Sequence, residues 1–243
     1  SISYLIDVYR RQTEPCRSPL DYFTFVAFFP QLMAGPIERA HHMLPQFGTP
    51  RRFDGERAAD GCRQILWGFF KKLTIADQLA PIVDVYFGAP RTATGGQLLV
   101  ATLAFTFQIY CDFSAYSDIA LGSARLLGIE LMRNFNRPYF ATSPQDFWRR
   151  WHISLSSWFR DYVYIPLGGS RTSAPRRALN LLVTFLVSGL WHGASWNFVL
   201  WGGVHGIAVM PSAFMKKGSE AKPGVLTTGM RALSAASREG APL

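Results

Sequence analysis

The stretch from Ala178 to Met215, ALNLLVTFLVSGLWHGASWNFVLWGGVHGIAVMPSAFM, decides the fold. It contains no Asp, Glu, Lys or Arg, and only His192 and His205 could carry a charge. As a helix it would measure about 57 Å, nearly twice the ~30 Å hydrocarbon core of a bilayer. The stretch therefore predicts a helical hairpin, or one membrane span with a re-entrant piece.

Further apolar segments extend this pattern over the chain. The segment from Gln97 to Ala124 is interrupted only by Asp112 and Asp118. Cys62 to Gly88 is a weaker candidate span, because it carries charged residues that include Lys71, Lys72, Asp77 and Asp84. Tyr22 to Ile37 is short and broken by proline and glycine, which favours a re-entrant or interfacial segment. The sequence predicts an all-α, polytopic transmembrane helical bundle.

The composition agrees with a membrane location. Hydrophobic residues make up 49% of the chain and charged residues 17%, against about 25% charged residues in a soluble protein. The net charge of +9 is carried by basic residues that lie between the apolar segments. On the predicted layout these clusters share one face, as the positive-inside rule requires. They form no basic face with interleaved aromatics, so we expect contact with lipid and no nucleic-acid binding.

His192 is the first candidate for chemistry. If Ala178 marks the membrane edge, His192 lies about 21 Å along the helix, and an ionisable group at that depth is a functional candidate. On a continuous helix, Ser188, His192 and Ser195 would share one side. Gly189, with a second glycine four residues later, would let a neighbouring helix pack closely. A structural histidine, hydrogen-bonded between helices, is the alternative.

His152 is the second candidate. It lies in DFWRRWHISLSSWFRDYVYIPLGG, from Asp146 to Gly169, where tryptophan and arginine alternate as they do at a membrane interface or along a wet cavity. The alternative for His152 is an anchoring role at the interface. His205 is expected to be packed among glycines.

Asp112 and Asp118 are carboxylates inside an apolar segment. Six residues apart on a helix, they point about 120° from each other, so they do not form a paired acid and base. We expect each to hold an arginine or a tyrosine hydroxyl within the bundle.

Several chemistries lack their motifs. The sequence contains no G-x-S-x-G, no H-E-x-x-H and no phosphate-binding glycine loop. Its three cysteines are widely spaced and predict neither a disulfide framework nor a metal site. Histidine remains as the candidate catalytic residue, because a neutral imidazole can take a proton from an alcohol near physiological pH.

Four blocks together resemble the membrane-bound O-acyltransferase (MBOAT) family, in particular its bacterial branch of alginate O-acetyltransferase membrane subunits. The blocks are FFPQLMAGPIERAHHMLPQF, YCDFSAYSDIALG, RNFNRPYFATSPQDFWRRWHISLSSWFRDYVYIPLGG and TFLVSGLWHGASWNFVLWGGVHG. The resemblance implies that His192 is the catalytic general base and that His152 is its companion beside the cavity. Candidate residues of the substrate cavity are Trp191, Trp196, Ser188, Ser195, Asp112, Asp118 and Arg150.

The resemblance also implies an activity and a place in the cell. It implies transfer of acetyl to hydroxyls of an exported, alginate-like polysaccharide by a multi-pass protein of the bacterial inner membrane. The donor would be acetyl-CoA or another activated acetyl, with no tightly bound cofactor, and the partners would be periplasmic acetyltransferase proteins. The alternatives are D-alanyl transfer to teichoic acid on the same fold, and a non-catalytic membrane scaffold or channel.

Both ends depart from the family pattern. Family members have further transmembrane helices on both sides, so residues 1–215 are expected to be part of a transmembrane domain. Residues 216–243 do not match the family, and their content of Gly, Ala, Ser and Pro favours a loosely ordered tail. Because those further helices are missing, the resemblance implies that this part of the protein can be inactive by itself.

Overall fold

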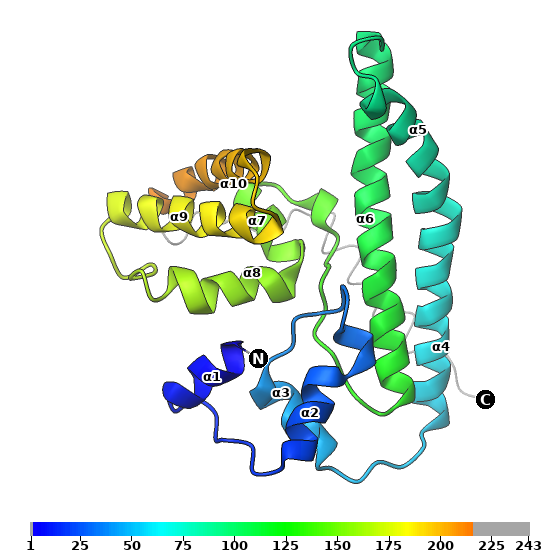
Figure 1. Cartoon of the computed structure of the whole chain (residues 1–243), viewed down its shortest axis with the longest axis vertical. Helices are drawn as coiled ribbons and strands as arrows, with labels where there is room; N and C mark the ends of the chain where they lie inside the picture. Colours follow the sequence, from blue (N-terminus) through cyan, green and yellow to red (C-terminus); the bar gives the residue numbers. More distant parts are fainter. Residues whose placement is uncertain (1, 216–243) are drawn as a thin grey trace, which may run out of the picture. The chain divides into compact units, whose positions relative to one another are not determined.

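The computed structural model describes residues 2–215, and within that range every regular element is a helix (Figure 1). This confirms the predicted all-α class. The chain divides into two compact units between Gly169 and Ser170. The predicted tail, 216–243, lies outside the described residues.

The first unit begins with three short helices, α1 (Ile2–Tyr9), α2 (Pro19–Ala27) and α3 (Ala40–Phe47), with the 3-10 helix η1 (Phe29–Gln31) between the last two. Ser18 caps α2 by accepting a hydrogen bond from the Asp21 N–H (3.2 Å). The helix ends before Pro30, as the sequence predicted. A buried cluster joins this region to the end of α6 and consists of Phe25, Phe28, Ala40, Met43, Leu121, Ala124, Ile129 and Leu131.

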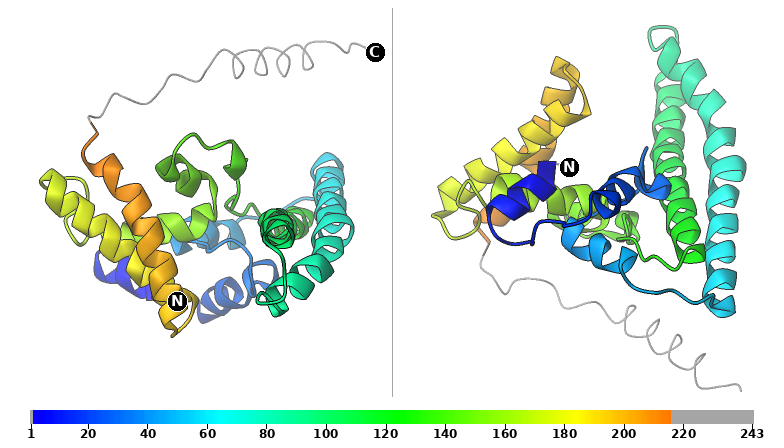
Figure 2. Two further views of the ribbon diagram at one scale, coloured as in Figure 1. Left: turned by 90° about the horizontal axis from the view of Figure 1, so that it is seen from above. Right: turned by 60° about the horizontal axis from the view of Figure 1, so that its bottom comes forward.

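A long antiparallel helical hairpin dominates the first unit. One arm comprises α4 (Gly55–Phe70), a π-helical segment η2 (Lys71–Ala76) and α5 (Asp77–Gly88), and the other arm is α6 (Gly95–Leu126). The arms lie side by side in every view (Figures 1 and 2). Within residues 2–215, α6 alone is long and apolar enough to cross a membrane.

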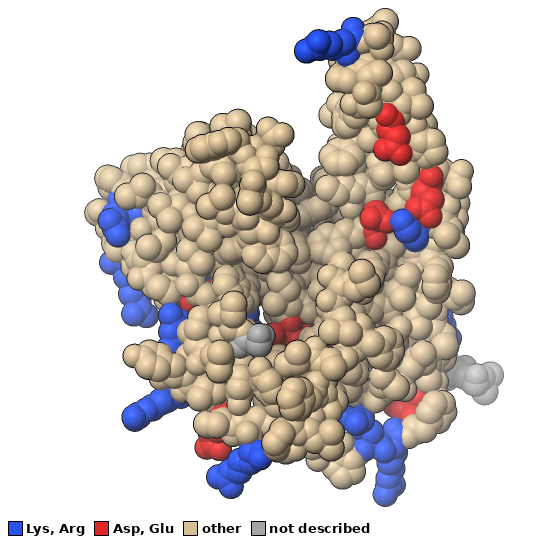
Figure 3. All heavy atoms as spheres, viewed as in Figure 1, with Lys and Arg blue, Asp and Glu red and all other residues tan. Residues whose placement is uncertain are grey.

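The basic side chains of the hairpin are distributed unevenly. Arg57 and Arg63 lie within the first nine residues of α4, and Arg125 lies in the last turn of the antiparallel α6, so all three lie toward one end. The opposite end, between α5 and α6, has Arg91. Lys71 and Lys72 lie partway along the first arm, and the charged side chains that Figure 3 shows on the shaft above the basic end are mostly acidic. The arrangement follows the charge asymmetry expected from the sequence.

Three shorter helical segments and a second π-helical segment complete the first unit. They are the 3-10 helix η3 (Pro138–Phe140), α7 (Pro144–Arg150), α8 (Ile153–Phe159) and the π-helical segment η4 (Arg160–Tyr164). Ser143 caps α7 by accepting from the Asp146 N–H (3.1 Å). Tyr139 and Trp151 belong to a cluster of aromatic rings that also includes Tyr110, Phe135 and Phe147. The predicted aromatic segment is therefore a packed structure and not a solvated loop.

The second unit is the hairpin predicted from the uncharged stretch. It consists of α9 (Ala174–His192) and α10 (Trp196–Val209), followed by the 3-10 helix η5 (Met210–Ala213). The helices approach closely at Gly189 and Gly202, where a Cβ at Gly189 would overlap the Phe198 carbonyl oxygen. The predicted close packing at Gly189 is confirmed, and the neighbouring helix is α10.

One prediction about this hairpin is wrong. Ser188, His192 and Ser195 do not share one helix, because α9 ends at His192 and Gly193 has extended backbone angles. Ser195 instead caps α10 by accepting a hydrogen bond from the Asn197 N–H (3.4 Å). A serine before an apolar run is a recognised start signal for a helix. Here a new helix begins after Ser195, although the three- and four-residue spacing of Ser188, His192 and Ser195 also suits one continuous helix.

Substitution of Gly189 by alanine should disrupt the α9–α10 hairpin. The added methyl group would meet backbone atoms of α10 that cannot move aside, so we expect a loss of about 2 kcal/mol or more in unfolding free energy. Gly203→Ala is the matched control, because its Cβ would lie 3.7 Å from the Leu186 side chain. Thermal unfolding in detergent should therefore separate the two variants, and equal melting temperatures would contradict the close backbone contact.

Candidate active site

His192 is the last residue of α9 and lies among aromatic rings. Its imidazole is 5.0 Å from the Trp191 ring and 5.1 Å from the Trp201 ring, both nearly perpendicular to it. The ring of Phe198 lies 6.3 Å away in a stacked orientation. Trp201 also contacts His205, which is half-buried, at 4.7 Å. The α10 helix thus supports the His192 ring through side chains that the sequence reasoning did not select.

His192 is accessible at the surface of the second unit and is not enclosed within it. Its side chain is exposed at the end of the helix. Trp191 and Trp196 are also exposed, at 55% and 79%. Ser188 is buried one turn earlier, while Ser195 is engaged in its cap. Among the candidate cavity residues in this unit, it is Trp191 whose ring contacts His192.

His152 occupies a constrained position in the first unit. Its backbone is left-handed, with φ 42° and ψ 56°, and it immediately precedes α8. Residues other than glycine adopt this conformation uncommonly, although histidine does so more often than most. The side chain is buried (8% exposed), and the Phe113 ring of α6 meets it edge-on at 4.6 Å. Buried contacts therefore hold His152 in a fixed corner between α7 and α8.

Asp112 and Asp118 pair with lysines, so the expectation of arginine or tyrosine partners was wrong. The Lys71 ammonium donates to the Asp118 carboxylate at 2.6 Å and to the Ser114 hydroxyl at 2.8 Å. Lys72 donates to Asp112 at 2.7 Å. Because the two aspartates have separate partners, they do not form one acid–base pair, as the spacing predicted.

Arg150, another candidate cavity residue, is held by a carboxylate of its own helix. Its Nε donates to Asp146 Oδ1 at 2.9 Å. This hydrogen bond is the main reason that the pKa of Asp146 lies below its usual value. Arg150 thus has a partner in the first unit.

The two candidate histidines belong to different units, His152 to the first and His192 to the second. Each has its own ring contacts, and the structure describes the two sites separately. Among residues 2–215 no group of three or more His, Cys, Asp or Glu side chains is arranged to hold a metal ion.

The sequence profile of the membrane-bound O-acyltransferase family, MBOAT, matches residues 15–224. The chain belongs to this family. Both histidines, the hairpin of the first unit and the hairpin of the second lie within the matched range, which is most of the described structure.

Individual MBOAT relatives come from bacteria. The chain is 50% identical over 206 residues to the "Probable alginate O-acetylase AlgI" of Azotobacter vinelandii, covering 85% of this chain and 41% of that protein. It is 45% identical to the "Peptidoglycan O-acetyltransferase" of Helicobacter pylori, over 78% of this chain and 36% of that protein. It is 29% identical to the "Teichoic acid D-alanyltransferase" of Streptococcus thermophilus, over 81% of this chain and 51% of that protein.

The chain therefore spans about two fifths of the length of the alginate O-acetylase that it matches. Within the MBOAT family, the part that aligns includes both W-H motifs quoted above, since they lie inside the matched residues.

Removal of the Lys71 ammonium should destabilise the first unit. Lys71→Met leaves the Asp118 carboxylate, whose side chain is 23% exposed, without its cation. We expect a loss of about 2 kcal/mol in unfolding free energy, less than for a fully buried pair. Lys71→Met combined with Asp118→Leu should recover most of this loss. Lys72→Met is the control, because the Lys72 side chain is 43% exposed and a smaller loss is expected. Chemical denaturation in detergent would measure the four proteins, and a double variant no better than Lys71→Met would contradict the pairing.

The Asp146–Arg150 interaction should make stability depend on pH. A carboxyl group whose pKa is lower in the folded state stabilises the fold above its unfolded pKa of about 3.9, and this contribution disappears as the pH falls through the folded pKa. Wild type should exceed Asp146→Asn by about 0.5 kcal/mol at pH 7, with the difference closing below about pH 4. Melting temperatures of both proteins between pH 7 and pH 3 would test this, and a constant difference would refute it.

Proposed function

We propose that the protein is a membrane O-acetyltransferase that modifies hydroxyl groups of an exported polysaccharide. The observation that carries the proposal is the 45–50% identity to relatives named as O-acetylases or O-acetyltransferases, against 29% to a D-alanyltransferase. The aligned region includes His192 and His152. The alginate name of the first relative makes an alginate-like polymer the first acceptor to test.

His192 would act as the general base. Its imidazole removes the proton of an acceptor hydroxyl, and the hydroxyl oxygen attacks the carbonyl carbon of an acetyl thioester. The carbon–sulfur bond then breaks, the acetyl ester remains on the sugar, and the thiol leaves with the proton from His192. The rings of Trp201 and Phe198 support this assignment, because they limit the orientations available to the imidazole.

His152 would orient the donor or stabilise the oxyanion that forms on the attacked carbonyl. Trp191 and Trp196 would limit the access of water. Ser188, Ser195, Asp112, Asp118 and Arg150 remain candidates for the wall of the substrate cavity. The donor would be acetyl-CoA or another activated acetyl that enters as a substrate, with no tightly bound cofactor.

The protein would be a multi-pass component of the bacterial inner membrane, built as a polytopic helical bundle. The length and apolar composition of α6 support a span there, and the basic end of the first hairpin would face the cytoplasm. Periplasmic acetyltransferase proteins would be its partners.

The decisive experiment is His192→Ala in the complete protein, expressed in native membranes. The acetyl content of the polymer should fall at least 100-fold, because the hydroxyl loses its general base. His41→Ala is the matched control, since His41 is an exposed histidine outside both motifs and should leave acetylation unchanged. Normal acetylation by His192→Ala would refute the assignment of the base.

Mass spectrometry of the modified polymer distinguishes the competing activities. An added acetyl group supports the proposal, whereas an added D-alanyl group supports the function named for the teichoic acid relatives. A polymer that is unmodified in the wild type and unaffected by either histidine variant would favour a scaffold or channel.

A further inference from the structure

Asn134 lies in the extended segment between α6 and η3, and it is connected to the residues that follow His152. Its backbone carbonyl accepts a hydrogen bond from the Ile153 N–H at 2.9 Å. Its side-chain oxygen, Oδ1, accepts from the Ser154 hydroxyl at 2.6 Å and lies 3.4 Å from the Ser154 N–H, which also donates to it. One residue thus binds the first two residues of α8.

These contacts replace the cap that α8 lacks. The first N–H groups of a helix have no partner within it, and a side chain at the cap position usually accepts from them. His152 occupies the cap position of α8, but its left-handed backbone provides no side-chain cap. Asn134 supplies the missing acceptors from a segment eighteen residues earlier. The left-handed turn at His152 is therefore stabilised from outside its own helix.

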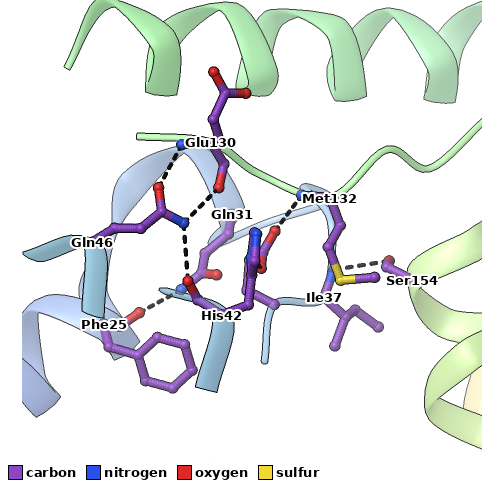
Figure 4. A network of polar contacts seen from close by, with 9 residues as sticks. Phe25, Gln31, Ile37, His42, Gln46, Glu130, Met132 and Ser154 are labelled. Carbon is purple, nitrogen blue, oxygen red and sulfur yellow. Dashed lines mark hydrogen bonds and ion pairs between the residues drawn. The ribbon is translucent and has the colours of Figure 1, made fainter. Parts of the chain in front are cut away.

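Asn134 is itself fixed on its other side. Its amide nitrogen donates to the Ser117 hydroxyl of α6 at 3.2 Å. The Ser154 hydroxyl also accepts from the Ile37 N–H at 2.9 Å, a contact drawn in Figure 4. Asn134 and Ser154 are 1% and 0% exposed, so water does not compete for these hydrogen bonds. The contacts link α6, the segment before α3 and the start of α8.

We propose that Asn134 is a positioning residue for His152. The Asn134 contacts fix the backbone on the C-terminal side of His152, and Phe113 of α6 meets the imidazole edge-on. Ser117, which anchors Asn134, lies four residues after Phe113 on the same helix. Residues of one turn of α6 therefore hold both the backbone next to His152, through Asn134, and its imidazole ring, through Phe113. Little rotational freedom is left to the imidazole. This inference rests on the proposed function, in which His152 acts on the donor.

Substitution of Asn134 should impair catalysis more than binding. Asn134→Ala removes the acceptor for both Ser154 donors while leaving His152 in the sequence. A shift of about 1 Å in a catalytic group can lower the rate by about 100-fold, so we expect kcat to fall 10- to 100-fold with KM changed less than threefold. Asn134→Asp keeps the Oδ1 acceptor and should recover at least a third of the wild-type kcat. The assay uses the complete protein in membranes, with acetyl-CoA and polymer, and normalises to the folded protein.

Gln46→Ala is the matched control. The Gln46 amide also bridges to the segment after α6, accepting from the Glu130 N–H at 2.8 Å and donating to the Glu130 carbonyl at 3.0 Å (Figure 4). It does not contact α8 in the described structure. Its loss should therefore leave kcat within twofold of wild type, which separates positioning of His152 from general weakening of this segment.

His152→Ala in the same assay separates the two proposals. If His152→Ala retains full activity, the proposed role of His152 fails and the role of Asn134 fails with it. If His152→Ala is inactive while folded Asn134→Ala keeps wild-type kcat, only the positioning role is overturned. Should Asn134→Ala not fold, Ser154→Ala tests the same hydrogen bond: a kcat loss of at least fivefold in folded protein supports the proposal, and a smaller loss refutes it.

Discussion

Polar groups inside apolar helices must find their partners within the protein, and this constraint organises the first unit. The Lys71 ammonium meets the Asp118 carboxylate and the Ser114 hydroxyl, which joins the two arms of the long hairpin. Asn134 meets Ser117 and Ser154, which joins α6 to the start of α8. An ion pair thus ties the two arms of the hairpin together, while neutral hydrogen bonds hold the backbone around His152.

The helical class and the second hairpin could be predicted because they follow from local properties. A stretch without charged residues, too long for one span, is compatible with few structures other than two helices. The end of α9 at His192 was harder to predict, because the helical spacing of Ser188, His192 and Ser195 continues across the break. The partners of Asp112 and Asp118 could not be read from spacing at all, since lysine, arginine and tyrosine can each satisfy a carboxylate.

The candidate histidines were found through two different signals. His192 stands out as an ionisable residue in an uncharged stretch, whereas His152 is selected mainly by the W-H-I-S-L motif within the family resemblance. The residues that contact and position the two histidines show no comparable signal in the sequence. Trp201 contacts His192 only because α10 folds back on α9, and Asn134 reaches α8 across intervening residues that include α7. Supporting residues of this kind depend on tertiary structure, so periodicity does not reveal them.

The π-helical segment at Lys71–Ala76 interrupts the α-helical repeat of the first arm, so α4 and α5 do not follow one continuous α-helical spacing. A π-helical turn accommodates one more residue than an α-helical turn, which rotates everything after it by about 100° relative to an uninterrupted α-helix. The apolar stripes of α4 and α5 are therefore out of phase in the sequence, although both helices pack on α6. Deleting one residue would turn one half of the arm away from α6 unless the facing side chains changed as well.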